Sequence, residues 1–446
     1  MIDTQTIRSK ILDLAIQGKL VEQDPNDEPA TVLLERIKAE KAALVKAGKI
    51  KKDKPLPPIT EDDIPFDIPD SWTWVRLGSV INLVSGRDLT PECYSDSSLN
   101  EGVPYITGAS NIENGKVIIN RWTAKPSTLA YKDDLLLTCK GTVGLLAFLP
   151  CECAHIARQV MSLQAFSCID MNYLKYFISS YIAELQRKAK SMIPGISRDD
   201  VLQILCPLPP LVEQKRIVKR IEQVFSLLDT IDALQTQYAD NIISLKNKLI
   251  DAAIQGKLVE QDREDIRPDF NGIKNKATDE LSFDIPDSWK IIHLEAGTDI
   301  IPSKKYQILE SEVKKNGKYF VISQSKEYSI GFCDDEKKLY KHETPVIVFG
   351  DHTSEVKYVD FNFVVGADGV KIFKPNIRIF HPKFLYYQFL FYARNINKIG
   401  GYSRHYKFIK NIPFVVPPLA EQKRIVAKIE ELMPLIDQYT SASEMK

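Results

Sequence analysis

Three blocks of sequence occur twice in this chain, and their order constrains the fold more than any other feature. Three exact or near-exact repeats in 446 residues do not arise by chance, so one structural element is used twice. The blocks are AIQGKLVEQD at residues 15–24 and 253–262, FDIPDSW at residues 66–72 and 283–289, and PPL-x-EQKRIV at residues 209–218 and 417–426.

The central copy of the repeated element is continuous, whereas the other copy is divided between the two ends of the chain. Residues 209–262 read PPLVEQKRIV, then a helical run, then AIQGKLVEQD, and the two ends carry these halves in reverse order. Joining the C-terminal half to the N-terminal half would give a second copy of the central element. The order therefore predicts a closed, pseudo-two-fold arrangement of two units.

Residues 212–255 have the pattern of one long helix, about 66 Å in length at 1.5 Å per residue. Prolines precede the run and Gly256 follows it, as is typical of the two ends of a helix. Apolar residues recur in alternating steps of four and three, which predicts a heptad seam. Taken alone, the seam fits a helical dimerisation arm as well as it fits a helix that packs within the chain. Its predicted members are Ile217, Ile221, Val224, Leu228, Ile231, Tyr238, Ile242, Leu245 and Leu249, with Ile425, Ile429, Leu432 and Ile436 in the C-terminal copy.

The composition limits the possible function classes. The 59 Lys and Arg residues balance 59 Asp and Glu residues, which argues against a protein whose whole surface binds phosphate. No stretch of about 18 uncharged apolar residues occurs, and the N-terminus lacks the apolar core of a secretory signal. Seven scattered cysteines fit a reducing compartment. We therefore expect a cytoplasmic protein with no membrane partner.

Two segments that differ in sequence lie between the repeated blocks. The second is basic, with 19 Lys and Arg against 11 Asp and Glu in residues 300–410, and it carries 21 of the 41 aromatic residues. A basic surface releases counterions from a phosphate backbone, which favours nucleic-acid binding. The first, residues 82–205, is balanced at 12 against 12. The aromatic run FLYYQFLFY at residues 384–392 is better interpreted as buried core than as a base-stacking surface.

Both segments mix short β-branched runs with Gly and Asn turns, which predicts small α+β domains that present loops. Before the first of them, residues 30–54 predict a helix and a basic tether, because residues 35–54 hold eight Lys and Arg against three acids. Most such charge runs are solvated faces. The proline-rich residues 55–72 predict an extended linker.

Motifs of catalysis are weak in this chain. It has no Gly-x-x-x-x-Gly-Lys-Ser/Thr phosphate loop, and residues 411–414 only partly match a methyltransferase loop. Glu213 and Glu421 lie in the first turns of the repeated helices, where a carboxylate complements the helix dipole. The Cys-x-Cys at residues 151–153 lies near His155, but no second pair at zinc-ligand spacing follows. We expect no catalytic residues and no metal.

The repeats and the two segments together resemble the specificity subunits of type I restriction-modification systems. The resemblance covers essentially the whole chain. Besides the repeated blocks it rests on LLLTCKGTVG at residues 135–144, IARQVMSL at residues 156–163 and VIVFGDHTSEVKYVDFNFVVGADGVKIF at residues 346–373.

The resemblance implies a non-catalytic DNA-reading subunit. Its fold would be α+β, with two globular α/β-mixed target-recognition domains joined by long antiparallel coiled-coil helices in a pseudo-two-fold, circular arrangement. Each domain would read one half of a bipartite site in double-stranded DNA. The helices would dock two methyltransferase subunits, and two motor-nuclease subunits would join the full complex. S-adenosylmethionine, ATP and magnesium would bind those partners, and this chain would hold no cofactor.

The domain boundaries expected on this basis divide the chain into six parts. They are residues 1–65, a helical region with a basic, proline-rich linker; 66–209, the first target-recognition domain; 210–262, the central helix; 263–282, a linker; 283–417, the second target-recognition domain; and 418–446, the C-terminal helix.

The DNA-contacting residues are predicted from loops within these domains. A Lys-Gly-Thr turn allows close backbone approach to phosphate, and Arg and Gln donors suit guanine and adenine edges. An ordinary β-turn and a surface ion pair explain the predicted residues of the first domain equally well. In the second domain, Asp351 and His352 are also typical of a capped turn. Arg404, His405 and Lys407 follow a Gly-Gly turn at residues 400 and 401. The predicted set is Lys140, Gly141, Thr142, Arg158 and Gln159 in the first domain and Gln324, Ser325, Lys326, Asp351, His352, Lys357, Arg404, His405 and Lys407 in the second.

Two other classes of function stay open. A coiled-coil scaffold that binds only proteins would show no salt-dependent DNA affinity, and the basic second segment argues against it. A degenerate methyltransferase or nuclease would show turnover by the isolated chain with S-adenosylmethionine or magnesium.

Overall fold

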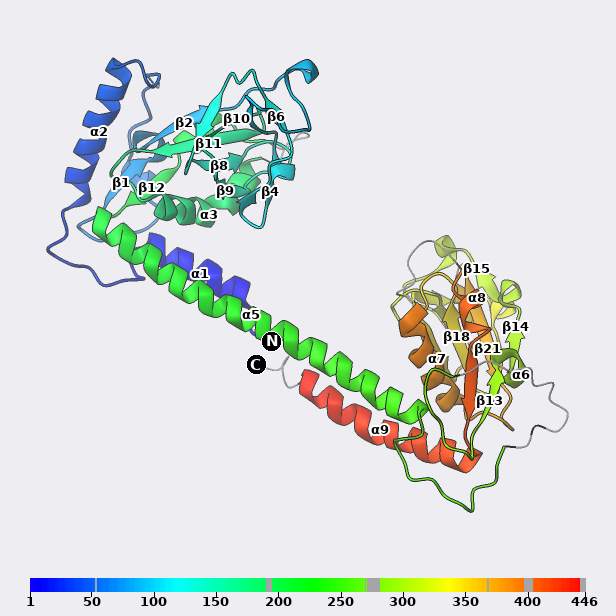
Figure 1. Ribbon diagram of the computed structural model, residues 1–446. Helices are drawn as coiled ribbons and strands as arrows, with labels where there is room; N and C mark the ends of the chain where they lie inside the picture. The colour runs from blue at the N-terminus through cyan, green and yellow to red at the C-terminus, as the bar shows by residue number, and fades with distance from the viewer. Residues whose placement is uncertain are drawn as a thin grey trace. The chain divides into compact units, whose positions relative to one another are not determined.

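The computed structural model describes residues 1–52, 54–189, 195–268, 270, 281–366, 369–396 and 404–441. These residues form two compact units, and the boundary between the units falls within helix α5 (Leu211–Ile254). Residues 2–234 are called the N-terminal unit below, and residues 235–446, with Met1, the C-terminal unit (Figure 1). Helix α5 begins and ends within one residue of the predicted limits.

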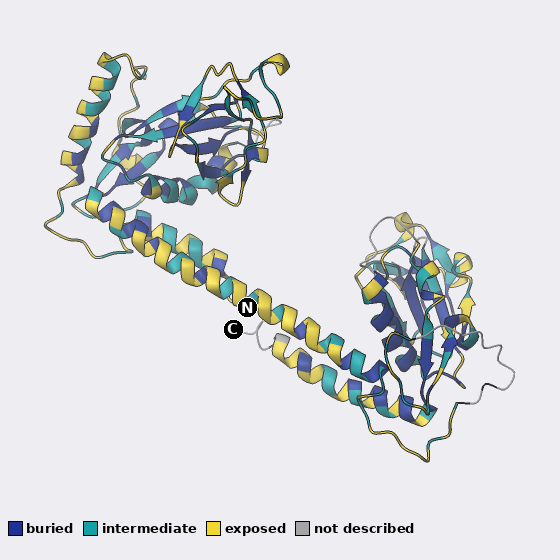
Figure 2. Cartoon of the chain, in the orientation of Figure 1, coloured by how far each residue is buried: buried dark blue, intermediate teal, exposed yellow. Residues whose placement is uncertain are grey.

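The N-terminal unit is built around two four-stranded sheets with the orders β6-β3-β10-β7 and β2-β11-β8-β9, together with the antiparallel pairs β1-β12 and β4-β5. Strand β8 is buried throughout, as expected for a central strand (Figure 2). The strands are β1 Thr73–Arg76, β2 Ile81–Ser85, β3 Val103–Ile106, β4 Ile112–Glu113, β5 Lys116–Val117, β6 Trp122–Thr123, β7 Leu129–Tyr131, β8 Leu135–Thr138, β9 Leu146–Phe148, β10 Cys153–Ile156, β11 Val160–Ala165 and β12 Leu205–Leu208, and the helices besides α5 are α1 Thr4–Ile16, α2 Ala30–Lys46, α3 Met171–Lys188 and α4 Arg198–Leu202.

The C-terminal unit also has two four-stranded sheets, with the orders β14-β21-β18-β19 and β15-β20-β16-β17, and an antiparallel pair β13-β22. Its strands are β13 Lys290–His293, β14 Thr298–Ile301, β15 Gln307–Ile308, β16 Tyr319–Ile322, β17 Gly331–Cys333, β18 Val346–Gly350, β19 Val356–Val359, β20 Val364–Gly366, β21 Val370–Pro375 and β22 Pro413–Val416, and its helices besides α5 are α6 Leu294–Gly297, α7 Pro382–Ile396, α8 Tyr406–Ile409 and α9 Leu419–Ser441.

One sheet has the same antiparallel pattern in both sheet-rich domains although their sequences differ. Strands β2-β11-β8-β9 are all antiparallel, and so are β14-β21-β18-β19 in the second domain. In the other sheet of each domain, a parallel pair (β3 with β10, β16 with β20) borders an antiparallel partner. The predicted pair of mixed α/β domains is confirmed.

The aromatic run at residues 384–392 forms most of helix α7. Phe384 and Phe389 are fully buried, and the Phe389 ring lies 4.9 Å from that of Phe373 in β21. The run therefore belongs to the core, as the sequence indicates, because rings at helical spacing bury large apolar areas against the sheet.

Helix α1 runs antiparallel to the first part of α5 within the N-terminal unit. Thr4 Oγ1 donates to Asp232 at 2.7 Å, and Arg8 pairs with Asp229 at 2.7 Å. At the other end of α1, Ala15 lies in the same buried cluster as Ile217. An apolar stripe between the helices, with charges at its border, holds them together.

Helix α9 has the same relation to the last part of α5 within the C-terminal unit. Tyr238 Oη donates to the carbonyl of Tyr439 at 2.7 Å, and Lys246 pairs with Asp437. At the opposite end of α9, Ile425 lies in the same buried cluster as Ala253.

The burial of the predicted seam differs along α5. Ile217, Ile221, Leu228, Ile242 and Leu249 are buried, as are Ile425, Ile429 and Ile436, while Val224, Ile231 and Leu432 are half-buried. Tyr238 and Leu245 are 39% and 49% exposed, so their prediction as seam residues is wrong for Leu245 and only partly right for Tyr238, whose hydroxyl reaches α9. An α-helix has 3.6 rather than 3.5 residues per turn, so the contact stripe drifts past Leu245 to the Lys246 side.

The repeated sequence blocks build a buried junction at the start of α5. Glu213 accepts hydrogen bonds from Trp72 Nε1 at 2.9 Å and Gln23 Nε2 at 2.6 Å, and Arg216 pairs with Asp27 at 2.5 Å. Burial raises the pKa of Glu213, and the hydrogen bonds from Trp72 and Gln23 oppose that rise. The predicted place of this glutamate in the first helical turn is confirmed, and its carboxylate is a buried acceptor.

The same junction occurs at the start of α9. Glu421 accepts from Trp289 Nε1 at 3.0 Å and Gln261 Nε2 at 2.6 Å, and Arg424 pairs with Asp265 at 2.8 Å. Burial raises the pKa of Glu421 in the same way. Identical sequence blocks thus join each sheet-rich domain to its helices by identical contacts.

None of the helices in the described ranges has the length and hydropathy needed for a membrane span.

Candidate nucleic-acid interface

Three loops of the N-terminal unit meet at one end of its sheets. They follow strands β2, β8 and β10, and backbone hydrogen bonds hold them together. Arg87 N donates to Ile156 O at 2.9 Å, Gly86 N to Val160 O at 3.1 Å, and Cys139 N to Gln159 O at 2.8 Å. The structure therefore brings together the predicted residues of the first domain, although they come from two separate stretches of sequence.

Arg158 and Gln159 share one partner in this cluster. The Arg158 guanidinium pairs with Asp88 at 2.7 Å, and its side chain is 64% exposed. With its amide turned to donate, Gln159 reaches Asp88 Oδ1 at 3.2 Å and Thr107 O at 3.0 Å. Both side chains are thus fixed at the surface. Arg158 keeps donors that suit a guanine edge, and Gln159, whose two N–H groups are used, keeps its carbonyl oxygen to accept from a base amino group.

Residues Lys140, Gly141 and Thr142 form an exposed turn after β8. Gly141 has a φ of +72°, a left-handed conformation in which glycine is favoured because it carries no Cβ. The turn lies beside the Arg158 loop, since the thiol of Cys139 contacts Arg158 O at 3.5 Å. Such a turn can bring backbone N–H groups and a lysine close to phosphate.

The buried side chain of His155 supports this loop cluster through the Arg87 carbonyl. Its Nε2 lies 2.9 Å from Arg87 O, and its Nδ1 lies 2.9 Å from Thr128 O. The residue is fully buried, and burial lowers its pKa, with the two backbone contacts opposing. Both ring nitrogens are engaged by backbone, so the neighbouring Cys-x-Cys is not completed into a metal site by His155.

The predicted residues of the second domain also converge on one end of its sheets. Gln324 follows β16 and His352 follows β18, and His352 N donates to Gln324 Oε1 at 3.2 Å. Thr353 Oγ1 donates to Gln324 O at 2.7 Å. Ser325 is half-buried and Lys326 is exposed on the same loop.

Asp351 connects this group to the segment before α8. It is 3% exposed, accepts from Tyr406 N at 2.8 Å through its carboxylate, and accepts from His405 N at 2.6 Å through its carbonyl. His405 Nδ1 lies 2.6 Å from Ser354 Oγ. Arg404 and Lys407 flank these contacts and are exposed, and the predicted Gly-Gly turn at residues 400 and 401 lies outside the described residues.

Two predicted contacts differ in character from the others. Lys357 is 5% exposed, and its ammonium donates to Ser323 O at 2.8 Å and to Glu327 O. Burial lowers its pKa. Buried as they are, Lys357 and Asp351 do not present their charges to a ligand; they hold the loops that carry Gln324 and His405.

Arg87 and Asp88 belong to this interface but were not predicted from the sequence. They follow the alternating strand β2 in the stretch Ser-Gly-Arg-Asp, and an exposed charged pair after a glycine at a strand end was the available signal. Their role depends on Arg158 and Ile156, about 70 residues away, so the local pattern did not reveal it.

In the described ranges, no three His, Cys, Asp or Glu residues are grouped as metal ligands would be. The interface consists of hydrogen-bond donors, half-exposed cations and turns, a set that binds and discriminates polar surfaces.

The sequence profile of a family described as "Type I restriction modification DNA specificity domain" matches residues 69–237 and 286–440. Among curated proteins, the chain is 30% identical over 260 residues to the type I restriction enzyme EcoAI specificity subunit of Escherichia coli, covering 56% of this chain and 44% of that protein. It is 32% identical over 267 residues to the EcoEI specificity subunit of Escherichia coli, covering 56% and 45%. The chain thus spans less than half the length of these two relatives. The crystal structure of the HsdS subunit from Thermoanaerobacter tengcongensis aligns at a TM-score of 0.47 and 18% identity, over 85% of this chain and 93% of that chain.

Proposed function

The chain belongs to the type I restriction modification DNA specificity family, and from this premise we propose that it is the DNA-reading subunit of a type I restriction-modification complex. The observation that carries the proposal is the match to both halves of the chain, one over each sheet-rich domain. Each of those domains presents a cluster of loops rich in Arg, Lys, Gln and His.

The subunit reads an asymmetric, gapped site in double-stranded DNA, one half-site per domain. The antiparallel sheet that the two domains share supports two similar readers, and their unlike loops support two unlike half-sites. Arg158 and Gln159 contribute base contacts in the first domain, and Gln324, His352 and Arg404 do so in the second. Lys140, Gly141, Thr142, Ser325, Lys326, His405 and Lys407 contact the backbone or flanking bases, while Asp351 and Lys357 hold the loops.

The long helices form antiparallel coiled coils in a pseudo-two-fold, circular frame. Support comes from the junction that repeats at Glu213 and Glu421, and from α1 and α9 each running antiparallel to α5 within its unit. Half-sites about one helical turn apart face the same side of a duplex, so a rigid spacer suits such a target.

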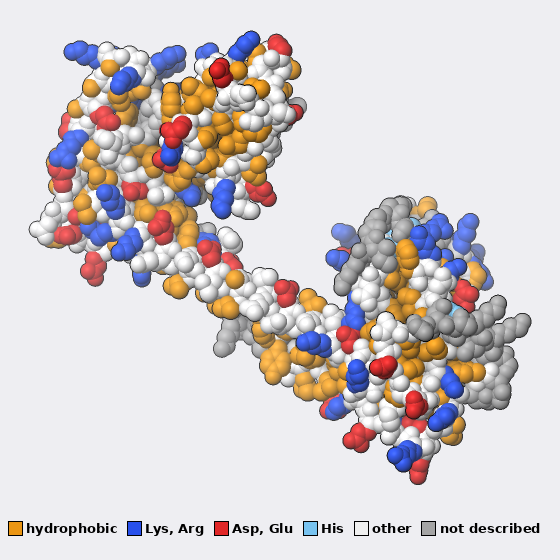
Figure 3. All heavy atoms as spheres, in the orientation of Figure 1, with side chains coloured by type: hydrophobic (Ala, Val, Ile, Leu, Met, Phe, Trp, Pro, Cys, Tyr) orange, Lys and Arg blue, Asp and Glu red, His pale blue; other side chains and the backbone are white. Residues whose placement is uncertain are grey.

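The outer faces of these helices dock two methyltransferase subunits, and two motor-nuclease subunits join them for restriction. Apolar residues exposed on α5 and α9 support this proposal, because such patches are typical of protein interfaces. Figure 3 shows apolar side chains in orange over α9. The exposed apolar residues include Leu227 at 66%, Leu234 at 58%, Ile243 at 58%, Leu245 at 49% and Leu435 at 49%.

The chain itself is non-catalytic, and S-adenosylmethionine, ATP and magnesium act on its partners. Its relatives support this role, since they are named as specificity subunits. The chain acts in the cytoplasm, because its DNA target and its partner subunits are there.

Mapping of methylated adenines tests the proposal. The chain is expressed with its methyltransferase partners, and a second strain carries a variant in which residues 82–205 come from another family member. We expect one half-site to change while the other and the gap stay the same. A change in both half-sites, or in neither, contradicts the proposal. If the chain shows no salt-dependent affinity for DNA, the result favours a coiled-coil scaffold that binds only proteins. Turnover by the pure chain with S-adenosylmethionine or magnesium would favour an enzyme.

A further inference from the structure

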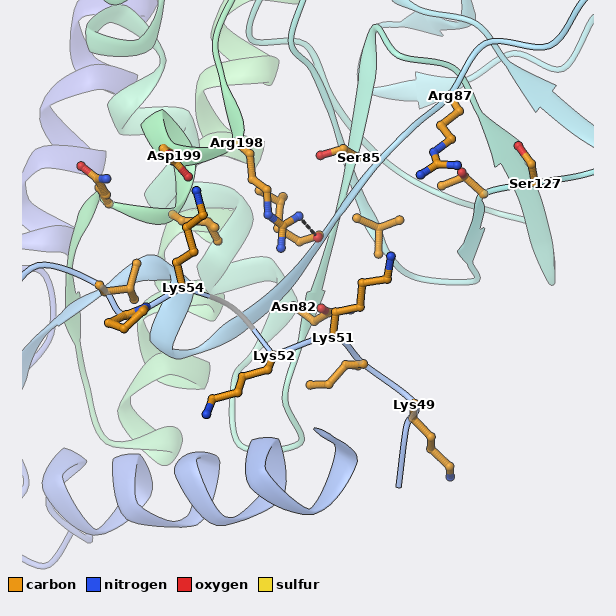
Figure 4. Close-up of a pocket in the computed structure, with 18 residues that line it drawn as sticks. Lys49, Lys51, Lys52, Lys54, Asn82, Ser85, Arg87, Ser127, Arg198 and Asp199 are labelled. Carbon is orange, nitrogen blue, oxygen red and sulfur yellow. Dashed lines mark hydrogen bonds between the residues drawn. The ribbon is translucent and has the colours of Figure 1, made fainter. Parts of the chain in front are cut away.

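A basic hollow of about 720 Å³ lies beside the loop cluster of the N-terminal unit. The segment that follows α2 forms one wall, and strand β2 with helix α4 forms the other (Figure 4). Six cations line it: Lys49, Lys51, Lys52, Lys54, Arg87 and Arg198.

The segment after α2 is anchored by apolar residues. Ile50 and Leu56 are half-buried and pack against the core of the sheet-rich domain, whereas the lysines between them are exposed. Figure 4 shows Lys51 and Lys54 directed toward the opposite wall, and Lys52 directed away from it. The predicted solvated tether is therefore held in place along the domain.

The lysines of this segment are not neutralised within the described ranges: Lys49, Lys51, Lys52 and Lys54 make no ion pair or hydrogen bond there. One acid, Asp199, lines the hollow, and Asp53 lies outside the described residues. Several like charges gathered without counter-charges create a positive potential that attracts anions.

The basic surface extends beyond this hollow. Lys52 and Lys54 also line a second hollow of about 570 Å³, whose other lysines are Lys38, Lys41 and Lys46. Figure 3 shows Lys and Arg side chains in blue at the C-terminal end of α2.

The charge of the two DNA-reading domains explains why such a segment is needed. Residues 300–410 carry a net charge of +8, whereas residues 82–205 are neutral overall. Phosphate contacts supply most of the sequence-independent affinity for DNA. The first domain thus has no net positive charge of its own, and the segment after α2 places additional lysines beside it.

We propose that the lysines of residues 49–54, with Arg87, bind the sugar–phosphate backbone of DNA next to the half-site that the first domain reads. This inference rests on the proposed function. Arg87 joins the two regions, because its neighbour Asp88 holds Arg158 and Gln159. A backbone in the hollow therefore lies close to the bases that these side chains contact.

The test measures the salt dependence of binding by the full chain to a duplex that carries its mapped site. The variant Lys51→Gln/Lys54→Gln should weaken binding and lower the slope of log K against log salt by about two, one unit for each lost phosphate contact. The methylated sequence should stay the same. Lys132→Gln/Lys188→Gln removes the same charge from the same unit outside the hollow and should leave the slope unchanged.

Three results overturn the inference while the proposed function stands: an unchanged slope in the hollow variant, an equal loss in the control, or an altered methylated sequence. Tripolyphosphate distinguishes the source of phosphate. If it binds the unmodified chain in the hollow as tightly as duplex does, the site takes free polyphosphate and the inference is wrong. If the unmodified chain recognises no DNA, both proposals fail.

Discussion

At the scale of single residues, the candidate interface depends on partners that are distant in sequence. Asp88 orients both Arg158 and Gln159, and His155 engages the Arg87 carbonyl with its ring. These supporting residues decide which donors are presented to a ligand, because a surface arginine without a fixed partner samples many rotamers.

Asp88→Asn removes the charge that holds Arg158 and keeps the shape of the side chain. We expect weaker discrimination in one half-site only, by about 1 kcal/mol or more for a base contact that is no longer positioned. Non-specific affinity should not fall, because a negative charge is lost. Competition binding with single-base variants of the mapped site measures both quantities. Asp96→Asn, whose carboxylate pairs with Arg121, is the control. Equal losses in the two variants would show that Asp88 has no positioning role.

His155 makes the N-terminal unit sensitive to mild acid. Burial lowers the pKa of His155 in the folded unit, so in mild acid this side chain is protonated more readily in the unfolded chain. Protonation therefore favours unfolding. The stability is fully present above the ordinary pKa of about 6.5 and is lost as the pH falls toward the lowered value. After correction for the pH dependence of intrinsic amide exchange, protection from hydrogen exchange around Arg87 should therefore fall between pH 7.5 and pH 5.5. His155→Gln should reduce that fall, and His342→Gln in the other unit should not. A pH response equal in all three chains would refute this role.

The sequence predicted the nature of the interface residues better than their individual roles. The Lys140 turn follows from its glycine, whose left-handed φ the structure confirms, while its contact with DNA stays a prediction. The burial of Lys357 was not predictable, because its carbonyl partners belong to another loop. Asp88 was missed for the same reason.

At the scale of elements, periodicity and capping residues were sufficient for the long helices. Helix α5 and the helix at residues 30–46 form where they were expected, and the run at residues 384–392, predicted only as core, forms most of helix α7. Individual seam positions were less predictable, as Leu245 shows, because the partner helix decides which side of α5 is covered. The antiparallel sheet that both domains share was not visible in the sequence, since different side chains fill it in each domain.

Gly18 and Gly48 allow a matched test of the junction. Both have a φ of +69°, but a Cβ at Gly18 would lie 2.5 Å from Pro69 Cγ, whereas one at Gly48 would meet nothing within 4 Å in the described ranges. Gly48→Ala should cost about 1 kcal/mol for the left-handed backbone alone. Gly18→Ala should cost about 3 kcal/mol, because overpacking adds to that strain. Urea unfolding followed by circular dichroism measures the difference, and equal losses would contradict the packing of Gly18 against Pro69.

At the scale of the whole molecule, the two sheet-rich domains are joined to their helices by the same junction. The junctions at Glu213 and Glu421 use the same side chains and nearly the same distances, so selection for a common frame is visible in the repeated blocks. The sequence order predicted this equivalence because a split repeat closes only if its ends meet the same partners as the central copy. The loops of the two domains differ, as the proposed asymmetric target requires.

The central claim of the proposed function is that the length of helix α5 sets the gap between the two half-sites. Seven residues inserted between Leu234 and Gln235 leave intact both the Thr4–Asp232 contact of one unit and the Tyr238–Tyr439 contact of the other. The insertion adds about 10 Å of helix, which corresponds to roughly three base pairs at about 3.4 Å each. The same seven residues inserted at Gly115, in the turn between β4 and β5, are the control.

Methylated-adenine mapping of the two insertion variants, each expressed with its partners, is the most direct measurement. The account predicts unchanged half-sites with a gap lengthened by about three base pairs for the α5 insertion, and an unchanged gap for the Gly115 insertion. An active α5 variant that methylates the original site with its original gap would contradict it.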